Sequence, residues 1–219
     1  MIEIQNLTKS YLHHKTGRSF VFKNLSFTIP SGRNLAIIGK NGAGKSTLMN
    51  ILSGVDAPDS GKIISDKRIS WPVGLRGGFQ GSLTGRQNAQ FVARVQGFSG
   101  EALREKVDFV EQFAEIGKYF DSPSSTYSSG MRSRVSFGIS LAFDFDYYLV
   151  DEAMAVGDAH FKRKARAAFD EKIGKANIIM VTHSMSQVRD MCDMVLVLEK
   201  GHVHFFEDIE AGIDYYDNL

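Results

Sequence analysis

The chain has a single cysteine, Cys192, and a single tryptophan, Trp71, among its 219 residues. One cysteine excludes an internal disulfide and is typical of a reducing compartment, so we expect Cys192 to be a small buried hydrophobic residue. No apolar run approaches the roughly 18 residues that a membrane helix needs, and the N-terminus lacks the pattern of a secretory signal. The sequence therefore predicts a chain that is soluble by itself and reaches a membrane only through a partner.

The chain also lacks an excess of charge of either sign, because 26 basic and 25 acidic residues leave a formal net charge of +1. Binding to nucleic acid generally needs a basic surface, so we expect no nucleic-acid partner. The densest basic cluster, Lys162 to Arg166, is interpreted as a solvated helix face. At this length we expect one domain with a full core, covering residues 1–219.

What the sequence does contain is a phosphate-binding loop, because residues 39–46 fit the pattern G-x-x-x-x-G-K-[ST] between an apolar run and a helical pattern. The pattern predicts that backbone N–H groups cradle phosphates at the N-terminus of the helix. It also predicts that Lys45 reaches the β- and γ-phosphates and that Ser46 ligates Mg²⁺. The nucleotide-binding residues expected here are Gly39, Asn41, Gly42, Ala43, Gly44, Lys45, Ser46 and Thr47.

A second apolar run, residues 147–150, ends in two carboxylates, Asp151 and Glu152. An aspartate at this place can hold the hydration shell of Mg²⁺. The glutamate after it can orient and polarise the attacking water. Combined with the phosphate loop, this pair predicts nucleotide hydrolysis.

A third feature, Ser128 and Gly130, stands at the expected start of a helix about 20 residues before Asp151. A serine and a glycine at a helix N-terminus can bind an anion, and they can equally form an ordinary N-cap. The sequence pattern alone leaves both interpretations open.

Strand and helix patterns alternate along the chain. Residues 1–11 and 20–29 predict antiparallel strands joined by a polar loop at 13–18, and a further short strand pair is expected from about 59 to about 71. Helical spacing follows from 86 to about 118, with Leu103, Val107, Val110 and Phe113 on one face.

The second half of the chain favours a parallel sheet. The runs 147–150 and 178–181 predict central strands, separated by a helix near 159–173. The fold class is therefore α/β: a P-loop nucleotide-binding fold with a mixed, mainly parallel core sheet, an N-terminal antiparallel β part and a small helical subdomain at about 81–143.

In this order, the motifs resemble those of the ATP-binding cassette family over nearly the whole chain. Residues 127–131 resemble its signature, usually Leu-Ser-Gly-Gly-Gln, and residues 155–158 resemble its D-loop. The resemblance implies ATP and Mg²⁺ as cofactors. It assigns catalysis to Glu152, the switch histidine His183 and the Q-loop glutamine Gln80; Mg²⁺ contacts to Ser46, Gln80 and Asp151; and ATP contacts to Tyr11 (stacking on adenine), Ser128, Gly130 and Asp158.

Two departures from the family pattern bear on activity. Ser129 and Met131 stand where Gly and Gln are usual, and Ala153 replaces the usual proline after Glu152. ATP hydrolysis is still expected, and the turnover rate is left open. Residues 71–88 resemble the ATPases of bacterial capsular polysaccharide exporters, although O-antigen and teichoic acid export ATPases share much of this pattern.

The resemblance implies the ATP-hydrolysing subunit of an exporter that drives capsular polysaccharide across the bacterial inner membrane. It implies a head-to-tail homodimer of nucleotide-binding domains, bound to an integral membrane exporter subunit at the cytoplasmic face and contacting the polysaccharide only indirectly. The alternatives are an O-antigen or teichoic acid exporter, or a soluble cassette ATPase outside transport. The last predicts fused cassettes, a long coiled-coil insertion or a basic surface, and the sequence has none of these.

Overall fold

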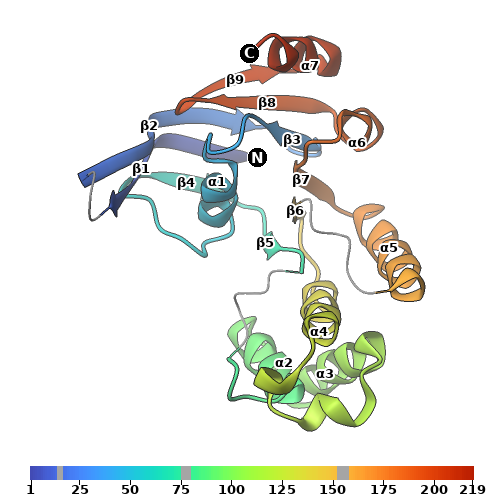
Figure 1. Cartoon of the computed structure of the whole chain (residues 1–219). Helices are drawn as coiled ribbons and strands as arrows, with labels where there is room; N and C mark the ends of the chain where they lie inside the picture. Colours follow the sequence, from blue (N-terminus) through green and yellow to red (C-terminus); the bar gives the residue numbers. More distant parts are fainter. Residues whose placement is uncertain (14–16, 75–79, 152–157) are drawn as a thin grey trace. The chain divides into compact units, whose positions relative to one another are not determined.

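A computed structural model describes residues 1–13, 17–74, 80–151 and 158–219. The chain divides into two compact units, each described here by itself (Figure 1). The sheet unit comprises residues 1–72, 145–152 and 176–219, and the helical unit comprises residues 73–144 and 153–175. The helical subdomain expected at about 81–143 falls inside the second unit.

The sheet unit contains an antiparallel sheet of three strands in the order β2-β1-β4. Its strands are β1 (Ile2–His13), β2 (Gly17–Ile29) and β4 (Ser60–Ser65). The loop predicted at 13–18 is too long, because β1 extends to His13 and β2 begins at its partner Gly17. Ladder hydrogen bonds join backbone groups, so polar and exposed side chains do not end an antiparallel pair.

The second sheet of this unit has six strands in the order β5-β6-β7-β3-β8-β9, parallel except that β9 pairs antiparallel with β8. The strand pair predicted at 59–71 is wrong, because β4 pairs with β1 and β5 pairs with β6. The bounds are β3 (Leu35–Ile38), β5 (Ile69–Pro72), β6 (Tyr147–Asp151), β7 (Asn177–Val181), β8 (Met194–Glu199) and β9 (His202–Phe206).

The core of the sheet unit lies between these sheets and the helix that follows the phosphate loop, α1 (Lys45–Leu52). Residues 147–150 and 178–181 are buried throughout, which confirms them as central strands. The remaining helices of the unit are α6 (Met185–Met191) and α7 (Ile209–Asp217). Cys192 is buried, and burial raises the pKa of its thiol to about 12, so the thiol is unreactive, as a packing residue should be.

The helical unit contains α2 (Gly85–Val95), α3 (Gly100–Ala114), α4 (Ser129–Leu141) and α5 (Ala159–Ile173), with short 3-10 turns at Gly117–Asp121 (η2) and Ser124–Thr126 (η3). The helical stretch expected from 86 to 118 is interrupted between α2 and α3. The predicted inner face is confirmed, because its four members are all buried: Leu103, Val107, Val110 and Phe113. Within the described ranges, no helix combines the length and apolar character needed to cross a bilayer.

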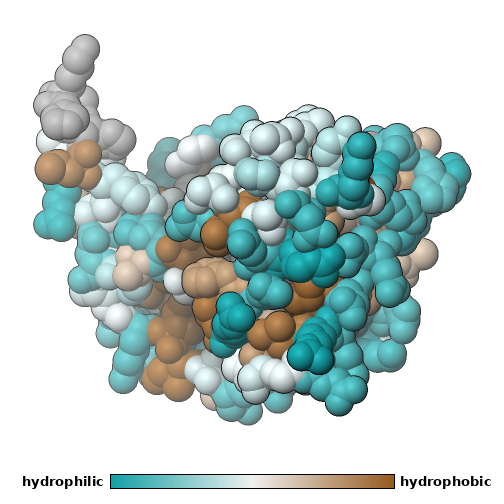
Figure 2. All heavy atoms as spheres, turned by 90° about the horizontal axis from the view of Figure 1, so that it is seen from below, coloured by the Kyte–Doolittle hydropathy of each residue, from teal (hydrophilic) through white to brown (hydrophobic). Residues whose placement is uncertain are grey.

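The surface drawn in Figure 2 is mostly hydrophilic, with hydrophobic areas between the polar side chains. Large apolar side chains are exposed on two helices of the helical unit: Phe91 and Val95 on α2, and Phe109 on α3. Phe91 and Val95 are four residues apart, so they share one face of α2. This face of α2 therefore presents two apolar side chains to solvent.

Candidate functional site: a phosphate cavity at the sheet end and a separate helical signature

Three adjacent parallel strands end at the same edge of the large sheet (Figure 1). The phosphate loop follows β3, Asp151 ends β6, and His183 follows β7. The register aligns the ends of these strands, since Val181 pairs with Ile37 of β3 on one side and with Asp151 of β6 on the other. Segments far apart in the chain therefore meet at the carboxyl edge, where ligands bind in parallel sheets.

The phosphate loop bends through conformations that favour glycine. Gly44 is the N-cap of α1 with a φ of 104°, and Gly42 has a φ of 82°. A Cβ on Gly39 would collide with the carbonyl of Leu198 on β8. The turn closes with a bond from the Ala43 N–H to the Lys40 carbonyl, 3.1 Å. These glycines let the chain reverse tightly before α1, so the first N–H groups of the helix point toward the cavity described next.

The Lys45 side chain folds back over the loop and is buried. Its ammonium donates to the carbonyls of Gly39, at 2.6 Å, and Lys40, at 3.2 Å. A cation held over a phosphate loop needs only a small movement to meet phosphate oxygens. Binding of Lys45 to the β- and γ-phosphates stays a prediction.

A cavity of about 390 Å³ is lined by eight of the residues that the sequence assigned to nucleotide, metal and catalysis, and Gly39 and Ala43 of the phosphate loop are not among its described lining residues. Sequence analysis missed two of its lining residues, Val21 of β2 and Val181 of β7, because no motif includes them. Alternation along β2 was the only signal available for Val21. The lining residues are Val21, Asn41, Gly42, Gly44, Lys45, Ser46, Thr47, Asp151, Val181 and His183.

The donor set of the cavity fits nucleotide phosphates and a hard cation. Backbone N–H groups and the Lys45 ammonium suit phosphate, and the Ser46 hydroxyl and Asp151 carboxylate suit Mg²⁺, which prefers oxygen ligands. His183 is exposed beside them and can donate to a terminal phosphate. The combination indicates a site for a nucleoside triphosphate.

Tyr11 is not among the described residues that line this cavity. Its hydroxyl donates to Asp56, 2.8 Å, and the Lys9 ammonium lies 5.0 Å from the centre of its ring. Lys9 also donates to Asp56, 2.7 Å, which holds the pKa of this carboxyl below its usual value. Tyr11 is exposed. Stacking of Tyr11 on adenine stays a prediction.

Ser128 and Gly130 begin the helix α4 of the helical unit. Ser128 is the N-cap and its hydroxyl accepts the Met131 N–H, 3.1 Å. A Cβ added to Gly130 would meet only the Ser128 hydroxyl, at 3.9 Å, so a ligand can approach the backbone closely. The structure confirms the N-cap interpretation for Ser128, and anion binding at this helix start stays a prediction.

Gln80 also lies in the helical unit and is fixed through its backbone. Its N–H donates to the Asn88 side chain, 3.0 Å, and its carbonyl accepts from the Ser124 hydroxyl, 3.0 Å. Asn88 is buried and bonds back to the Gln80 carbonyl, 3.3 Å. The Gln80 side chain stays exposed, as a residue that contacts a metal or a partner must be.

Asp158 is the N-cap of α5 and accepts the Phe161 N–H, 2.9 Å. It also accepts from the guanidinium of Arg134 on α4, 2.5 Å. The backbone bond, with the charge of Arg134 as a further cause, holds the pKa of Asp158 below its ordinary value. Sequence analysis missed Arg134, since only the packing of α4 against α5 brings the two residues together.

The described ranges exclude residues 152–157. The proposed catalytic carboxylate, Glu152, and the replaced proline position, Ala153, fall in that gap, so their predicted roles lie outside the described residues.

The model of the ABC transporter family matches residues 22–155, so the chain belongs to the ABC transporter family. The fold and the cavity define it as an ATPase of the cassette type. A dimeric post-hydrolysis structure of the ATP-binding cassette MJ0796, bound to ADP and Pi, matches with a TM-score of 0.72 and 22% identity over 93% of this chain and 97% of that one. At that identity the likeness supports the fold alone.

Two curated relatives resemble the chain along its length. The polysialic acid transport ATP-binding protein KpsT of Escherichia coli is 56% identical over 217 residues, covering 99% of this chain and 96% of that protein. The capsule polysaccharide export ATP-binding protein CtrD of Neisseria meningitidis serogroup B is 42% identical over 219 residues, covering 100% of both. Both relatives are ATP-binding proteins of export or transport by name.

Proposed function

We propose that this chain is the ATP-hydrolysing subunit of an exporter that moves capsular polysaccharide across the bacterial inner membrane. The observation that carries the proposal is the cavity at the sheet edge, where Lys45, Ser46, Asp151 and His183 come together. The full-length similarity to KpsT and CtrD supports the choice of a capsular glycan. An O-antigen or teichoic acid polymer is the alternative cargo.

The roles of the residues follow from their chemistry. Lys45 binds the β- and γ-phosphates and neutralises charge as the bond to the γ-phosphate breaks. Ser46 and Asp151 would hold Mg²⁺, which supplies charge neutralisation on the phosphates when bound. Glu152 polarises the attacking water, and His183 donates to the γ-phosphate, which orients the phosphoryl group that the water attacks while ADP leaves.

The proposed assembly is a head-to-tail homodimer. The chain has one phosphate loop, in the sheet unit, and one signature, Ser128 and Gly130, in the helical unit. Two copies would then form two equal ATP sites, each from the loop of one copy and the signature of the other. Binding of ATP closes the dimer, and hydrolysis opens it.

The proposed membrane partner is an integral exporter subunit at the cytoplasmic face. The exposed apolar pair Phe91 and Val95 on α2 supports a contact surface in the helical unit. Motion would pass through the segment that holds Gln80. The chain itself would act as a motor, with selectivity for the polysaccharide in its partners.

The catalytic part of the proposal is tested with Glu152→Gln. This variant should bind ATP as the parent does and release phosphate at a rate reduced by about 100-fold or more, because an amide cannot take a proton from water. It should also become dimeric with ATP in light scattering, since unhydrolysed nucleotide keeps the two copies together. Normal turnover in this variant would remove Glu152 from its proposed role.

The cargo is tested by deleting the gene in its host and identifying the surface glycan that disappears and the polymer that accumulates inside. Loss of capsule supports the proposal, and loss of O-antigen or teichoic acid selects the alternative. Complementation with the Lys45→Ala chain should fail in either case, whereas the parent chain should restore export. Unchanged glycans would overturn the transport assignment.

A further inference from the structure

Two segments of the helical unit that are distant in sequence run side by side ahead of α4. The Ser124 N–H donates to the Leu83 carbonyl, 2.8 Å, and the Ser124 hydroxyl donates to the Gln80 carbonyl, 3.0 Å. Residues 80–85 and 123–127, called the paired segments below, therefore join the Q-loop glutamine to the start of the signature.

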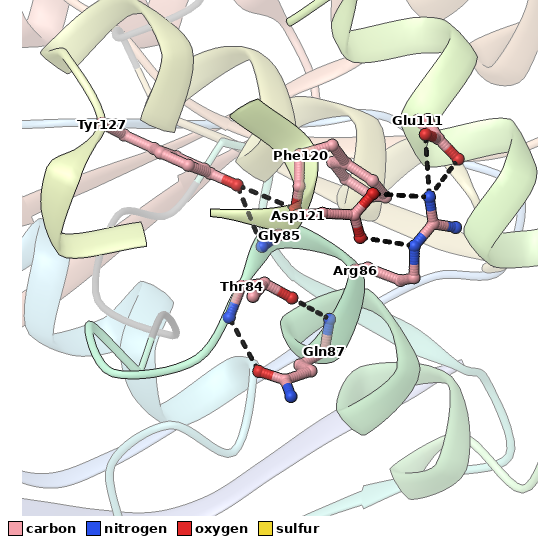
Figure 3. Close-up of polar contacts among 8 residues, drawn as sticks. All are labelled: Thr84, Gly85, Arg86, Gln87, Glu111, Phe120, Asp121 and Tyr127. Carbon is pink, nitrogen blue, oxygen red and sulfur yellow. Dashed lines mark hydrogen bonds and ion pairs between the residues drawn. The ribbon is translucent and has the colours of Figure 1, made fainter. Parts of the chain in front are cut away.

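The side chain of Tyr127 lies at the end of the paired segments that contains Gly85, and its hydroxyl forms two hydrogen bonds there (Figure 3). The Gly85 N–H donates to its hydroxyl, 2.9 Å, and the hydroxyl donates to the Phe120 carbonyl, 3.2 Å. The residue is only 5% exposed, and burial raises the pKa of the hydroxyl. The group thus stays protonated at neutral pH, when it acts as donor and acceptor at once.

Gly85 lies so close to the Tyr127 hydroxyl that a side chain at this position would collide with it. A Cβ on Gly85 would stand 2.6 Å from the hydroxyl oxygen and 2.8 Å from the Phe120 ring. The Arg86 guanidinium lies 5.2 Å from the centre of this ring and donates to Asp121, 2.7 Å. The start of α2 is thus connected to η2 in two ways: through the Tyr127 hydroxyl, which bonds to both elements, and through the ion pair of Arg86 with Asp121 (Figure 3).

We propose that Tyr127 is a positioning residue for the signature: its hydroxyl ties the residue before Ser128 to the first turn of α2, which sets the place of Ser128 relative to Gln80. A leucine, usual at this place in the family pattern, has no hydroxyl and cannot make either bond. The inference rests on the proposed function, because Ser128 matters only where it meets the ATP of a second copy.

The first test removes the hydroxyl alone. In the Glu152→Gln chain, Tyr127→Phe should weaken the ATP-dependent dimer by about fivefold, the factor expected when the displaced Ser128 loses one net hydrogen bond to the nucleotide of the second copy. ATP binding to the monomer should not change, because the phosphate loop belongs to the sheet unit. Dimer dissociation constants from analytical ultracentrifugation, and titration of the monomer with a fluorescent ATP analogue, give the two readouts.

The matched control is Tyr147→Phe. Tyr147 is as deeply buried, and its hydroxyl donates to the Pro30 carbonyl, 3.0 Å, within the sheet unit. Losing this bond should lower the melting temperature by a comparable amount and leave the dimer constant unchanged. The pair of variants separates positioning of the signature from general stability.

A second test changes Gly85, the other partner of the Tyr127 hydroxyl. Gly85→Ala should weaken the dimer at least as much as Tyr127→Phe, and the double variant should lose less than the two single effects combined. Gly81→Ala is the glycine control, since its Cβ would meet Ser125 at an ordinary 3.6 Å. Its dimer constant should match that of the parent.

The outcomes separate the two proposals. If the Glu152→Gln parent forms no dimer with ATP, the proposed assembly fails and this inference fails with it. If the parent dimerises but Tyr127→Phe is indistinguishable from Tyr147→Phe, only the positioning role is overturned. A loss of monomer ATP binding in Tyr127→Phe also overturns it, and a weaker dimer with unchanged monomer binding supports it.

Discussion

The sheet unit and the helical unit hold their functional residues by different means. In the sheet unit, Asp151 and His183 reach the phosphate loop because β6, β7 and β3 are adjacent parallel strands in one register. In the helical unit, Gln80, Ser128 and Asp158 are placed by hydrogen bonds and ion pairs that involve single side chains.

The difference teaches where point substitutions should act. A strand register is secured by many ladder bonds and a buried core, so one substitution changes the chemistry of the cavity without moving it. In the helical unit, each of these contacts depends on a single side chain. Asn88 bonds to Gln80, Arg86 pairs with Asp121, and Arg134 pairs with Asp158. Substitutions there should change geometry or stability before they change nucleotide binding.

The largest expected effect is Lys45→Ala. Removing the ammonium at the cavity should reduce ATP affinity by about 100-fold or more, because charge-assisted bonds to two phosphates are lost. The melting temperature should change little, since the strands keep their register. Calorimetric titration with ATP measures the affinity, and Lys62→Ala, an exposed lysine of β4, is the control. A variant that binds ATP normally would contradict the assignment of the cavity.

The second expected effect is in the helical unit, with Arg86→Ala. Arg86 donates to Asp121 and to both oxygens of Glu111, 2.8 Å each, and is only partly exposed. Its loss should lower the free energy of unfolding by about 1–2 kcal/mol, discounted for the exposure of the carboxylates. ATP binding to the monomer should stay unchanged. This result would show that a contact of the helical unit affects stability without affecting nucleotide binding in the sheet unit.

Urea denaturation measures the effect of Arg86→Ala. The control is Arg166→Ala, because the ion pair of Arg166 with Asp170 lies on an exposed face of α5. This variant should lower the free energy of unfolding by less than about 0.5 kcal/mol. Equal losses in the two variants would show that the Arg86 contacts add nothing beyond a surface ion pair.

The smallest expected effect is the pH dependence of Asp158. The folded pKa of Asp158 lies below that of the unfolded chain, so its stabilising effect is complete above about pH 4 and is lost as the pH falls through the folded pKa. Asp158→Asn keeps an N-cap but not the charge, so its stability should depend less on pH. Melting temperatures from pH 6 to 2.5 compare the two, and a constant difference over this range would contradict the interpretation.

The phosphate loop and the central strands could be predicted because each depends on local sequence. The pattern from Gly39 to Ser46 needs only nearby residues, and a strand buried on both faces is apolar throughout. Strand partners could not be predicted in the same way. β4 and β5 are neighbours in the chain but lie in different sheets, because each pairs with a strand from a distant segment.

By itself, the sequence determined the family and the nucleotide class of ligand and predicts the roles of Lys45, Ser46 and Asp151, because the backbone conformation and charge of a phosphate loop follow from its residue types. Only the tertiary structure decided that Val21 lines the cavity, that Arg134 holds Asp158 and that Tyr127 bonds Gly85. These contacts join residues 20 or more positions apart. Their formation depends on the packing of whole helices and sheets, and short sequence patterns carry no record of that packing.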